Sequence, residues 1–255
     1  MIASVAKRRY FPAALGIGSL LVFVALLELL IRVAIINRFI VPMPSDIIAA
    51  FPRVVVEEHV LQRFLLTAGE AFSASILVAI VGVAGGVVLH RYHLLRLATE
   101  TWVAAIASAP LVLMYPLYLV IFGRSALTIV MMGFTAGIAP VILKTLEGLL
   151  ATRRVLINVG KSFNLSPSQQ FWKILFPAAL PTIFVGLRLG LIFALINIVG
   201  VEFLINFGGL GQLINELAER YDLAGTYAAI CFVILVSIAV FVLTERLERW
   251  LRPVD

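Results

Sequence analysis

Long apolar runs dominate this sequence, and each is about as long as a bilayer is thick. Polar segments, most of them short, separate the runs along the 255 residues. A helix needs roughly 20 apolar residues to cross the hydrocarbon core of a membrane. Charged residues make up only 13% of the chain, about half of the share typical of soluble domains. The sequence therefore predicts an all-α polytopic membrane protein, with residues 1–255 forming a single transmembrane domain.

The apolar runs define six expected transmembrane helices and one long polar interruption at residues 150–177. We place the spans at about residues 13–36, 65–89, 99–122, 125–146, 178–204 and 226–243. The first run is longer than the 7–15 apolar residues of a signal peptide, so we interpret it as a span. Lysine and arginine gather in the segments that this arrangement assigns to the cytoplasm, which predicts that both termini are cytoplasmic.

The composition also argues against several other classes of protein. The net charge of +6 is better explained by cytoplasmic loop anchors than by nucleic-acid binding, because no basic stripe with stacking aromatics is present. The single cysteine, Cys231, lies in an apolar run, and the three histidines are scattered near span ends. We therefore expect no metal site and no nucleic-acid partner.

Polar residues inside apolar spans are costly and usually face the bundle interior or a water-filled path. Glu28 and Arg32 share one face of the first span, where they could form an ion pair, face the lipid interface or line a pore. In the third span, prolines six positions apart favour a helix that lines a cavity. The candidate residues for the translocation pathway or for gating are Pro110, Met114, Tyr115, Arg188, Asn197 and Glu202. We expect Arg188 near the cytoplasmic end, and Glu202 near the outer end at a pore mouth or docking site.

The segment 150–177 has the pattern of a short polar helix that enters a membrane span. Ser166 is a good N-cap and Pro167 suits the first helical position. Polar side chains at 169, 170 and 173 could form hydrogen bonds with a partner, and Phe171 with Trp172 could anchor an interface. The alternative is a solvated amphipathic helix on the membrane surface.

The stretch from Asn158 to Arg188 resembles the cytoplasmic EAA loop of bacterial ABC-importer permeases. In KILFPAALP, Pro177 falls on the proline of that pattern, Asn164 falls on its glycine, and Asn158-Val159-Gly160 replaces the EAA triplet. Four other stretches resemble the nitrate, sulfonate and taurine branch of the family: VPMPSDI, TAGEAFSAS, ASAPLVLMYPLYLVIFG and VGVEFLINFGGLGQLI. The resemblance covers about residues 40 to 250, in the family's order.

The resemblance implies a type I ABC-importer permease with a cytoplasmic coupling helix, in a bacterial inner membrane. A dimer of such chains would form the pore in membrane lipid, with a periplasmic or lipid-anchored substrate-binding protein. Two partner ATP-binding cassette subunits would bind ATP–Mg, since no GxxxxGK[ST] phosphate loop occurs here, and this chain would be neither an enzyme nor a cofactor binder. The implied ATPase-coupling residues are Asn158, Gly160, Asn164, Ser166, Pro167, Gln169, Gln170, Phe171, Trp172, Lys173 and Pro177.

The same branch predicts a small anion or a compact organic solute as substrate, such as a sulfonate, taurine, nitrate, bicarbonate or a vitamin precursor. A stand-alone secondary transporter or channel is the alternative function. Such proteins often carry inverted repeats, and the first three spans show no visible match to the last three. A membrane enzyme would need a cluster of histidine, aspartate or cysteine in the spans, and none is visible.

Overall fold

The computed structural model is helical throughout the part of the chain that it describes. It describes residues 2–251, except for the side chains of 2–10, 13, 247 and 249–251. The basic N-terminal side chains and the last four residues of the expected cytoplasmic tail therefore lie outside the described part. The helices are α1 Ile2–Arg32, α2 Pro44–Glu57, α3 Val60–Leu77, η1 Val78–Gly82, α4 Val83–Arg91, α5 His93–Ser108, η2 Leu111–Met114, α6 Tyr115–Phe122, α7 Ala126–Leu150, α8 Arg154–Ser162, α9 Pro167–Gln170, η3 Phe171–Leu175, α10 Phe176–Ile205, α11 Gly209–Glu219 and α12 Leu223–Leu251.

Five helical stretches of the described chain are long and apolar enough to cross a membrane, and a bent pair of helices makes a sixth candidate. The five are Ala14–Arg32, Val60–Arg91, Ala126–Leu150, Pro167–Ile205 and Leu223–Arg246. The stretch Val60–Arg91 joins α3, the π-helical turn η1 and α4, whereas Pro167–Ile205 joins α9, the π-helical turn η3 and α10. An all-α membrane architecture with six possible crossings is what the apolar runs predict.

The span expected at 99–122 is not one continuous helix. Helix α5 ends at Ser108, and the pair of stretches His93–Ser108 and Leu111–Phe122 is bent by 92°. Ala109 has extended backbone angles (φ −77°, ψ 143°) because a residue that precedes proline is pushed away from the helical region. Pro110 therefore breaks the helix that the sequence was expected to form here.

The chain divides into two compact units, and the first contains residues 1–60 and 213–232. Here the Glu28–Arg32 pair that the sequence suggested is an ion pair at 2.8 Å. Glu28 also accepts hydrogen bonds from the hydroxyl (2.8 Å) and the backbone N–H (3.1 Å) of Ser45. Helix α2 begins at Pro44, so this carboxylate holds the start of α2 to the end of α1.

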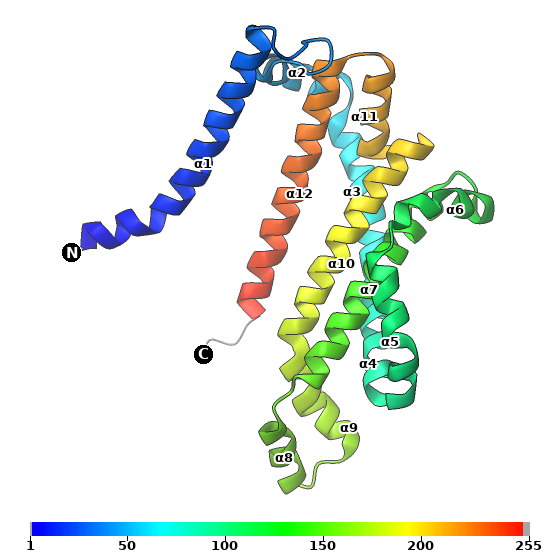
Figure 1. Cartoon of the computed structure of the whole chain (residues 1–255). Coiled ribbons are helices and arrows are strands. Elements are labelled where there is room, and N and C mark those ends of the chain that lie inside the picture. Colours follow the sequence, from blue (N-terminus) through cyan, green and yellow to red (C-terminus); the bar gives the residue numbers. More distant parts are fainter. Residues whose placement is uncertain (1, 252–255) are drawn as a thin grey trace. The chain divides into compact units, whose positions relative to one another are not determined.

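The second unit contains residues 61–212 and 233–255, and its core is the pair α7 and α10. These helices run side by side (Figure 1). A Cβ at Gly137 would lie 2.6 Å from the carbonyl oxygen of Gly190, and a Cβ at Gly190 would lie 2.9 Å from that of Gly137. The two backbones approach closely because neither position has a side chain, which is a common solution for packing helices inside membranes.

Glycines also bring the second span against α7. A Cβ at Gly82 would lie 2.8 Å from Cγ1 of Val141, and a Cβ at Gly86 would lie 2.5 Å from Cβ of Thr145. Beside this contact, a buried apolar cluster joins α3, α7 and α10 through Ala71, Ala74, Ile129, Met132, Ala194, Ile198, Val201 and Ile205. The second unit therefore holds α10 rigidly along most of its length.

Candidate functional site: the 150–177 hairpin and the α10 span

The segment 150–177 folds as a helical hairpin, in which α8 turns back through residues 163–165 onto α9 and η3. In Figure 1 this hairpin lies beyond the ends of α7 and α10. Ser166 is the N-cap of α9 and Pro167 is its first residue, as the sequence predicted. The Ser166 hydroxyl accepts a hydrogen bond from the N–H of Gln169 (3.3 Å), and the Gln169 side chain accepts one from the N–H of Ser166 (3.0 Å). This reciprocal capping box fixes where the helix that leads into the membrane begins.

Close contacts hold the two arms of the hairpin together. Gly160 is buried, and a Cβ there would lie 2.5 Å from Cδ1 of Ile174. The side-chain amide of Gln170 donates a hydrogen bond through Nε2 to the backbone carbonyl of Ile157 at 3.0 Å. The third position of the expected EAA triplet is therefore small because α8 packs directly on η3 at this point.

Asn164 lies in the turn between the arms with a left-handed backbone (φ 52°). Glycine adopts this region most easily, and asparagine is among the few other residues that tolerate it. Asn164 stands where the EAA pattern has its glycine, so the replacement keeps the turn that the glycine makes.

The outer surface of the hairpin combines exposed apolar side chains with basic ones. Val155, Val159 and Phe163 follow each other at i, i+4 and i+8 from α8 into the turn, and are 70%, 46% and 75% exposed. Trp172 is 61% exposed. The segment has no aspartate or glutamate. Its basic residues are exposed too: Arg153, Arg154, Lys161 and Lys173.

The two adjacent aromatic residues of the hairpin have different roles. Phe171 is partly buried and packs against the apolar cluster of Leu149, Ala179 and Ile183. Its ring meets that of Trp172 edge-on, with the centroids 5.1 Å apart. The ring of Phe171 therefore contributes to the protein's own packing, and a contact of either aromatic with a partner stays a prediction.

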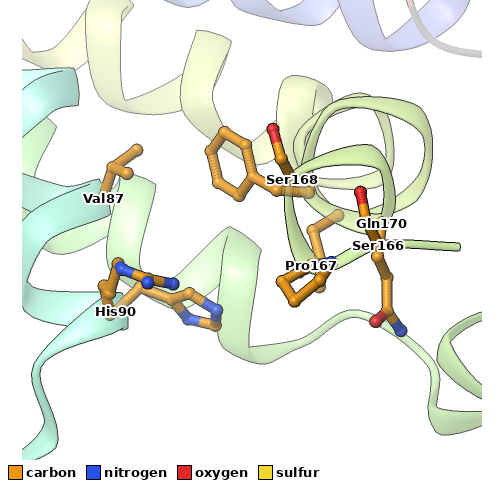
Figure 2. A pocket seen from close by; sticks show the side chains of 9 residues that line it. Val87, His90, Ser166, Pro167, Ser168 and Gln170 are labelled. Carbon is orange, nitrogen blue, oxygen red and sulfur yellow. The ribbon is translucent and has the colours of Figure 1, made fainter.

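A partly open cavity of about 730 Å³ lies between the end of α4 and the start of α9. Figure 2 shows Val87 and His90 on one side and Ser166, Pro167, Ser168 and Gln170 on the other. The cavity lining is completed by Arg91, Phe171 and Leu175. No carboxylate is among these lining residues, so the polar part of the cavity carries donors and positive charge.

On α10, Arg188 lies in a second cavity of about 430 Å³, which α3, α10 and the last part of α12 line. Its guanidinium forms an ion pair with Glu248 at 2.8 Å and lies over the ring of Phe241 at 5.3 Å from the centroid. Glu248 is itself buried. Most of this cavity's other lining is apolar, so a charged pair is held where few other groups can solvate it.

Glu202 is fully buried (0% exposed), and its expected place at a pore mouth or docking site stays a prediction. Its carboxylate accepts hydrogen bonds from the hydroxyl of Thr67 (2.7 Å) and from the N–H of Gly211 (2.8 Å). The oxygen of Thr67 accepts another from the N–H of Leu210 at 2.9 Å. These groups fasten the first turn of α11 to α3 and α10.

The remaining pathway candidates are scattered, and the structure does not gather them into one site. Pro110 and Met114 are exposed at the break between α5 and α6, whereas Tyr115 packs against the apolar cluster of the second unit. The side-chain amide of Asn197 donates a hydrogen bond to the backbone carbonyl of Phe193 in the same helix, at 2.9 Å. Their place in a pathway stays a prediction.

Residues 75–253 match the sequence profile of a family described as "Binding-protein-dependent transport system inner membrane component". The chain belongs to this family. Its function is accordingly that of a multi-pass transport permease, the membrane component of an importer, as the EAA-like loop predicted.

Several relatives of this permease have named transport roles. It is 23% identical to the taurine transport system permease protein TauC of Escherichia coli K12. The match extends over 245 residues, which are 92% of this chain and 89% of that protein. It is 28% identical to the nitrate import permease protein NrtB of Synechocystis sp. PCC 6803, over 72% of this chain and 66% of that one. The aliphatic sulfonates permease SsuC of Bacillus subtilis 168, described as putative, is 21% identical over 89% and 83%.

Solved structures support the same fold for the permease. A structure of the MetNI methionine ABC transporter in an inward-facing conformation matches with a TM-score of 0.67 at 18% identity, over 76% of this chain and 96% of that chain. An amino acid ABC transporter crystallised with histidines matches with a TM-score of 0.64 at 17% identity, over 78% and 97%. The expected type I importer fold is thereby confirmed.

Sequence reasoning missed several residues that the structure brings into these sites. Thr67 lies inside α3, where its hydroxyl donates a hydrogen bond to Glu202. Glu248 is in the charged C-terminal stretch, where nothing in the sequence indicated a partner in α10. The capping serine of α9 was the exception, because its signal is local in the sequence.

Proposed function

We propose that this permease forms the pore of an ATP-driven importer together with a second copy of itself. Two cytoplasmic ATP-binding cassette subunits supply the energy, and a substrate-binding protein outside the membrane delivers the solute. The hairpin of residues 150–177 is the coupling element and lies on the cytoplasmic side, as do both termini in this proposal. Family membership supports the binding protein as a partner, because dependence on one is part of the family description.

The observation that carries this proposal is the exposed surface of the hairpin. An apolar ridge of Val155, Val159 and Phe163 is presented beyond the spans, although exposing such side chains to water is unfavourable. The ridge is flanked by basic residues and by no carboxylate. A partner with an apolar and acidic cleft would cover this surface, and Asn158, Gln169 and Lys173 would add polar contacts at its rim.

The hairpin is connected to α10 in a way that would transmit a movement of α8 into the membrane. The capping box fixes the start of α9, and the chain continues through η3 and α10 to Ile205. The contacts of Gly160 and Gln170 attach α8 to this continuous helical stretch, which we call the rod. A π-helical turn such as η3 often occurs at a functional site. A force on α8 would therefore reach α10 and, through the glycine contacts, α7.

The substrate we propose is a small anion or a compact organic solute. The relatives named for taurine, nitrate and sulfonate support this class. Within the spans, Arg188 supplies a cation beside a cavity. Its counter-ion Glu248 would have to be displaced or shared if an anion approached, which gives the pair a gating role.

The coupling role is tested by replacing residues 167–172 with a flexible glycine–serine linker of equal length. We expect the variant to insert in the membrane but to lose ATP-driven uptake and solute-stimulated ATP hydrolysis. The matched control replaces residues 36–41, a mostly exposed turn of equal length in the first unit. Normal ATP-driven transport by the 167–172 variant would contradict the proposal.

A further inference from the structure

The cavity between α4 and α9 lies where two membrane spans end. The span Val60–Arg91 finishes at its rim, and the span Pro167–Ile205 begins there. Tyr92 and Trp172 follow the lining residues Arg91 and Phe171 in the chain, and both are exposed. Exposed tyrosine and tryptophan gather at the level of the lipid headgroups, which favours a position of the cavity near that level.

The lining of this cavity is amphipathic. Arg91, His90, Ser166 and Ser168 supply a cation and hydrogen-bond donors, whereas Val87, Phe171 and Leu175 form an apolar wall. Its volume of about 730 Å³ lies within the range of roughly 300–1,000 Å³ that small-molecule sites occupy. An occupant must therefore combine an anionic group with an apolar part.

His90 lines this cavity with one edge of its imidazole ring. Its Nδ1 atom is buried away from the cavity, so an occupant would contact the ring through Nε2. The Ser166 hydroxyl accepts a bond from the backbone of Gln169, which leaves its own O–H free to donate.

We propose that this cavity binds the phosphate group of an anionic phospholipid from the surrounding membrane. Arg91, His90 and Ser166 contact the phosphate oxygens, and the acyl chains leave along Val87, Phe171 and Leu175. Basic pockets between spans at a membrane surface bind lipid headgroups of this kind. The lipid joins the end of α4 to the start of the hairpin and thereby supports the element proposed to receive the ATPase.

Two other occupants fit the observations less well. Inorganic phosphate would satisfy Arg91 and His90 but would leave the apolar wall uncovered. A side chain of a cytoplasmic protein would have to enter at headgroup level, past the exposed Tyr92 and Trp172. The lipid accounts for the charge, the apolar wall and the position together.

Native mass spectrometry of the full chain in mild detergent tests the proposal, with phosphatidylglycerol and phosphatidylcholine as probes. We expect the first phosphatidylglycerol to bind at least tenfold more tightly than phosphatidylcholine. The double variant His90→Ala/Arg91→Ala should reduce this preference to less than twofold, whereas Arg91→Lys should retain it. The matched control is Arg154→Ala, which removes the same charge from an exposed position outside the cavity and should bind like the wild type.

Three outcomes would overturn the assignment. The first is equal binding of the two lipids by the wild type. The second is an equal loss of lipid in the Arg154→Ala control, which would indicate general surface charge. The third is displacement of phosphatidylglycerol by millimolar inorganic phosphate or by a co-purified ATPase, which would assign the cavity to a free anion or to the partner. Size-exclusion profiles of all variants keep misfolding separate from loss of binding, and Arg91→Gln replaces the double variant if that one does not fold.

Discussion

The carboxylate of Glu202 and the hydroxyl of Thr67 are 135 positions apart in the chain and lie 2.7 Å from each other. Around this bond, Gly211 donates its N–H to the same carboxylate. The reversal between α10 and α11 runs through Asn206, Gly208 and Gly209, which all have positive φ. Glu202 is thus the anchor of an unusual turn at one end of the rod that begins in the hairpin.

We predict that Glu202→Ala lowers the free energy of unfolding by about 2–4 kcal/mol. The N–H of Gly211 would be buried without an acceptor, and the hydroxyl of Thr67 would keep only the longer bond to the carbonyl of Arg63 at 3.3 Å. Glu202→Gln keeps one acceptor for Gly211 and should cost about 1 kcal/mol. Thermal unfolding in detergent, followed by scanning fluorimetry, measures both. Equal losses for the two variants would show that the carboxylate does not anchor α11.

The close approach of α7 and α10 gives a second prediction. In Gly190→Ala the new methyl would lie 2.7 Å from Cγ2 of Val141, and overpacking of this kind costs roughly 1–3 kcal/mol. The control Gly69→Ala lies on α3 with nothing within 4 Å, so it should stabilise the helix by about 0.5–1 kcal/mol. Unfolding temperatures that shift in the same direction for both variants would refute the contact.

The pair of Arg188 and Glu248 should behave as a coupled unit. Removing one charge leaves the other in a mostly apolar cavity, so we expect Arg188→Ala to cost about 3–5 kcal/mol. The double variant Arg188→Leu/Glu248→Leu should be more stable than Arg188→Ala alone. A double-mutant cycle on unfolding temperature measures this coupling, and additive effects would mean that the two side chains are independent.

Uptake assays on the same variants separate packing from gating at this pair. If the double variant regains stability but not uptake, the charges act on the transported solute or on a gate. If uptake returns together with stability, the pair is structural only, and Arg188 leaves the set of pathway candidates.

The apolar runs and the local motifs of the sequence predicted the membrane class, the approximate spans and the helix start at Ser166. Those features depend on residues close together in the chain, such as Ser166 with Gln169. Bonds such as Thr67–Glu202 and Arg188–Glu248 join distant segments, and no periodicity in the sequence points to them. The break at Pro110 was underestimated because a proline alone does not fix the size of a bend.

Asp222 gives the first unit a predicted dependence on pH. Burial alone would raise the pKa of its carboxyl, but hydrogen bonds from Arg53 and from the N–H of Gly225, with the charges of Arg53 and Arg220, bring that pKa below its usual value. A lowered pKa means that the stabilisation is present above the unfolded value of about 4 and is lost as the pH falls through the folded value.

We therefore expect the unfolding temperature of the wild type to fall more steeply below about pH 4 than that of Asp222→Asn. Arg53→Ala should make the fall of the unfolding temperature at acid pH less steep as well, because it removes the hydrogen bond to Asp222. An equally steep fall of the unfolding temperature at acid pH in all three proteins would mean that this ion pair does not link folding to pH.

The coupling role of the hairpin is tested most directly by photo-crosslinking in the native membrane. A photoreactive amino acid placed at Val159, on the exposed ridge of α8, should capture an ATP-binding cassette subunit that mass spectrometry identifies. The same probe at Phe39, which is exposed in the first unit, should not. Capture of lipid alone at Val159, or of the ATPase equally at Phe39, would contradict the account.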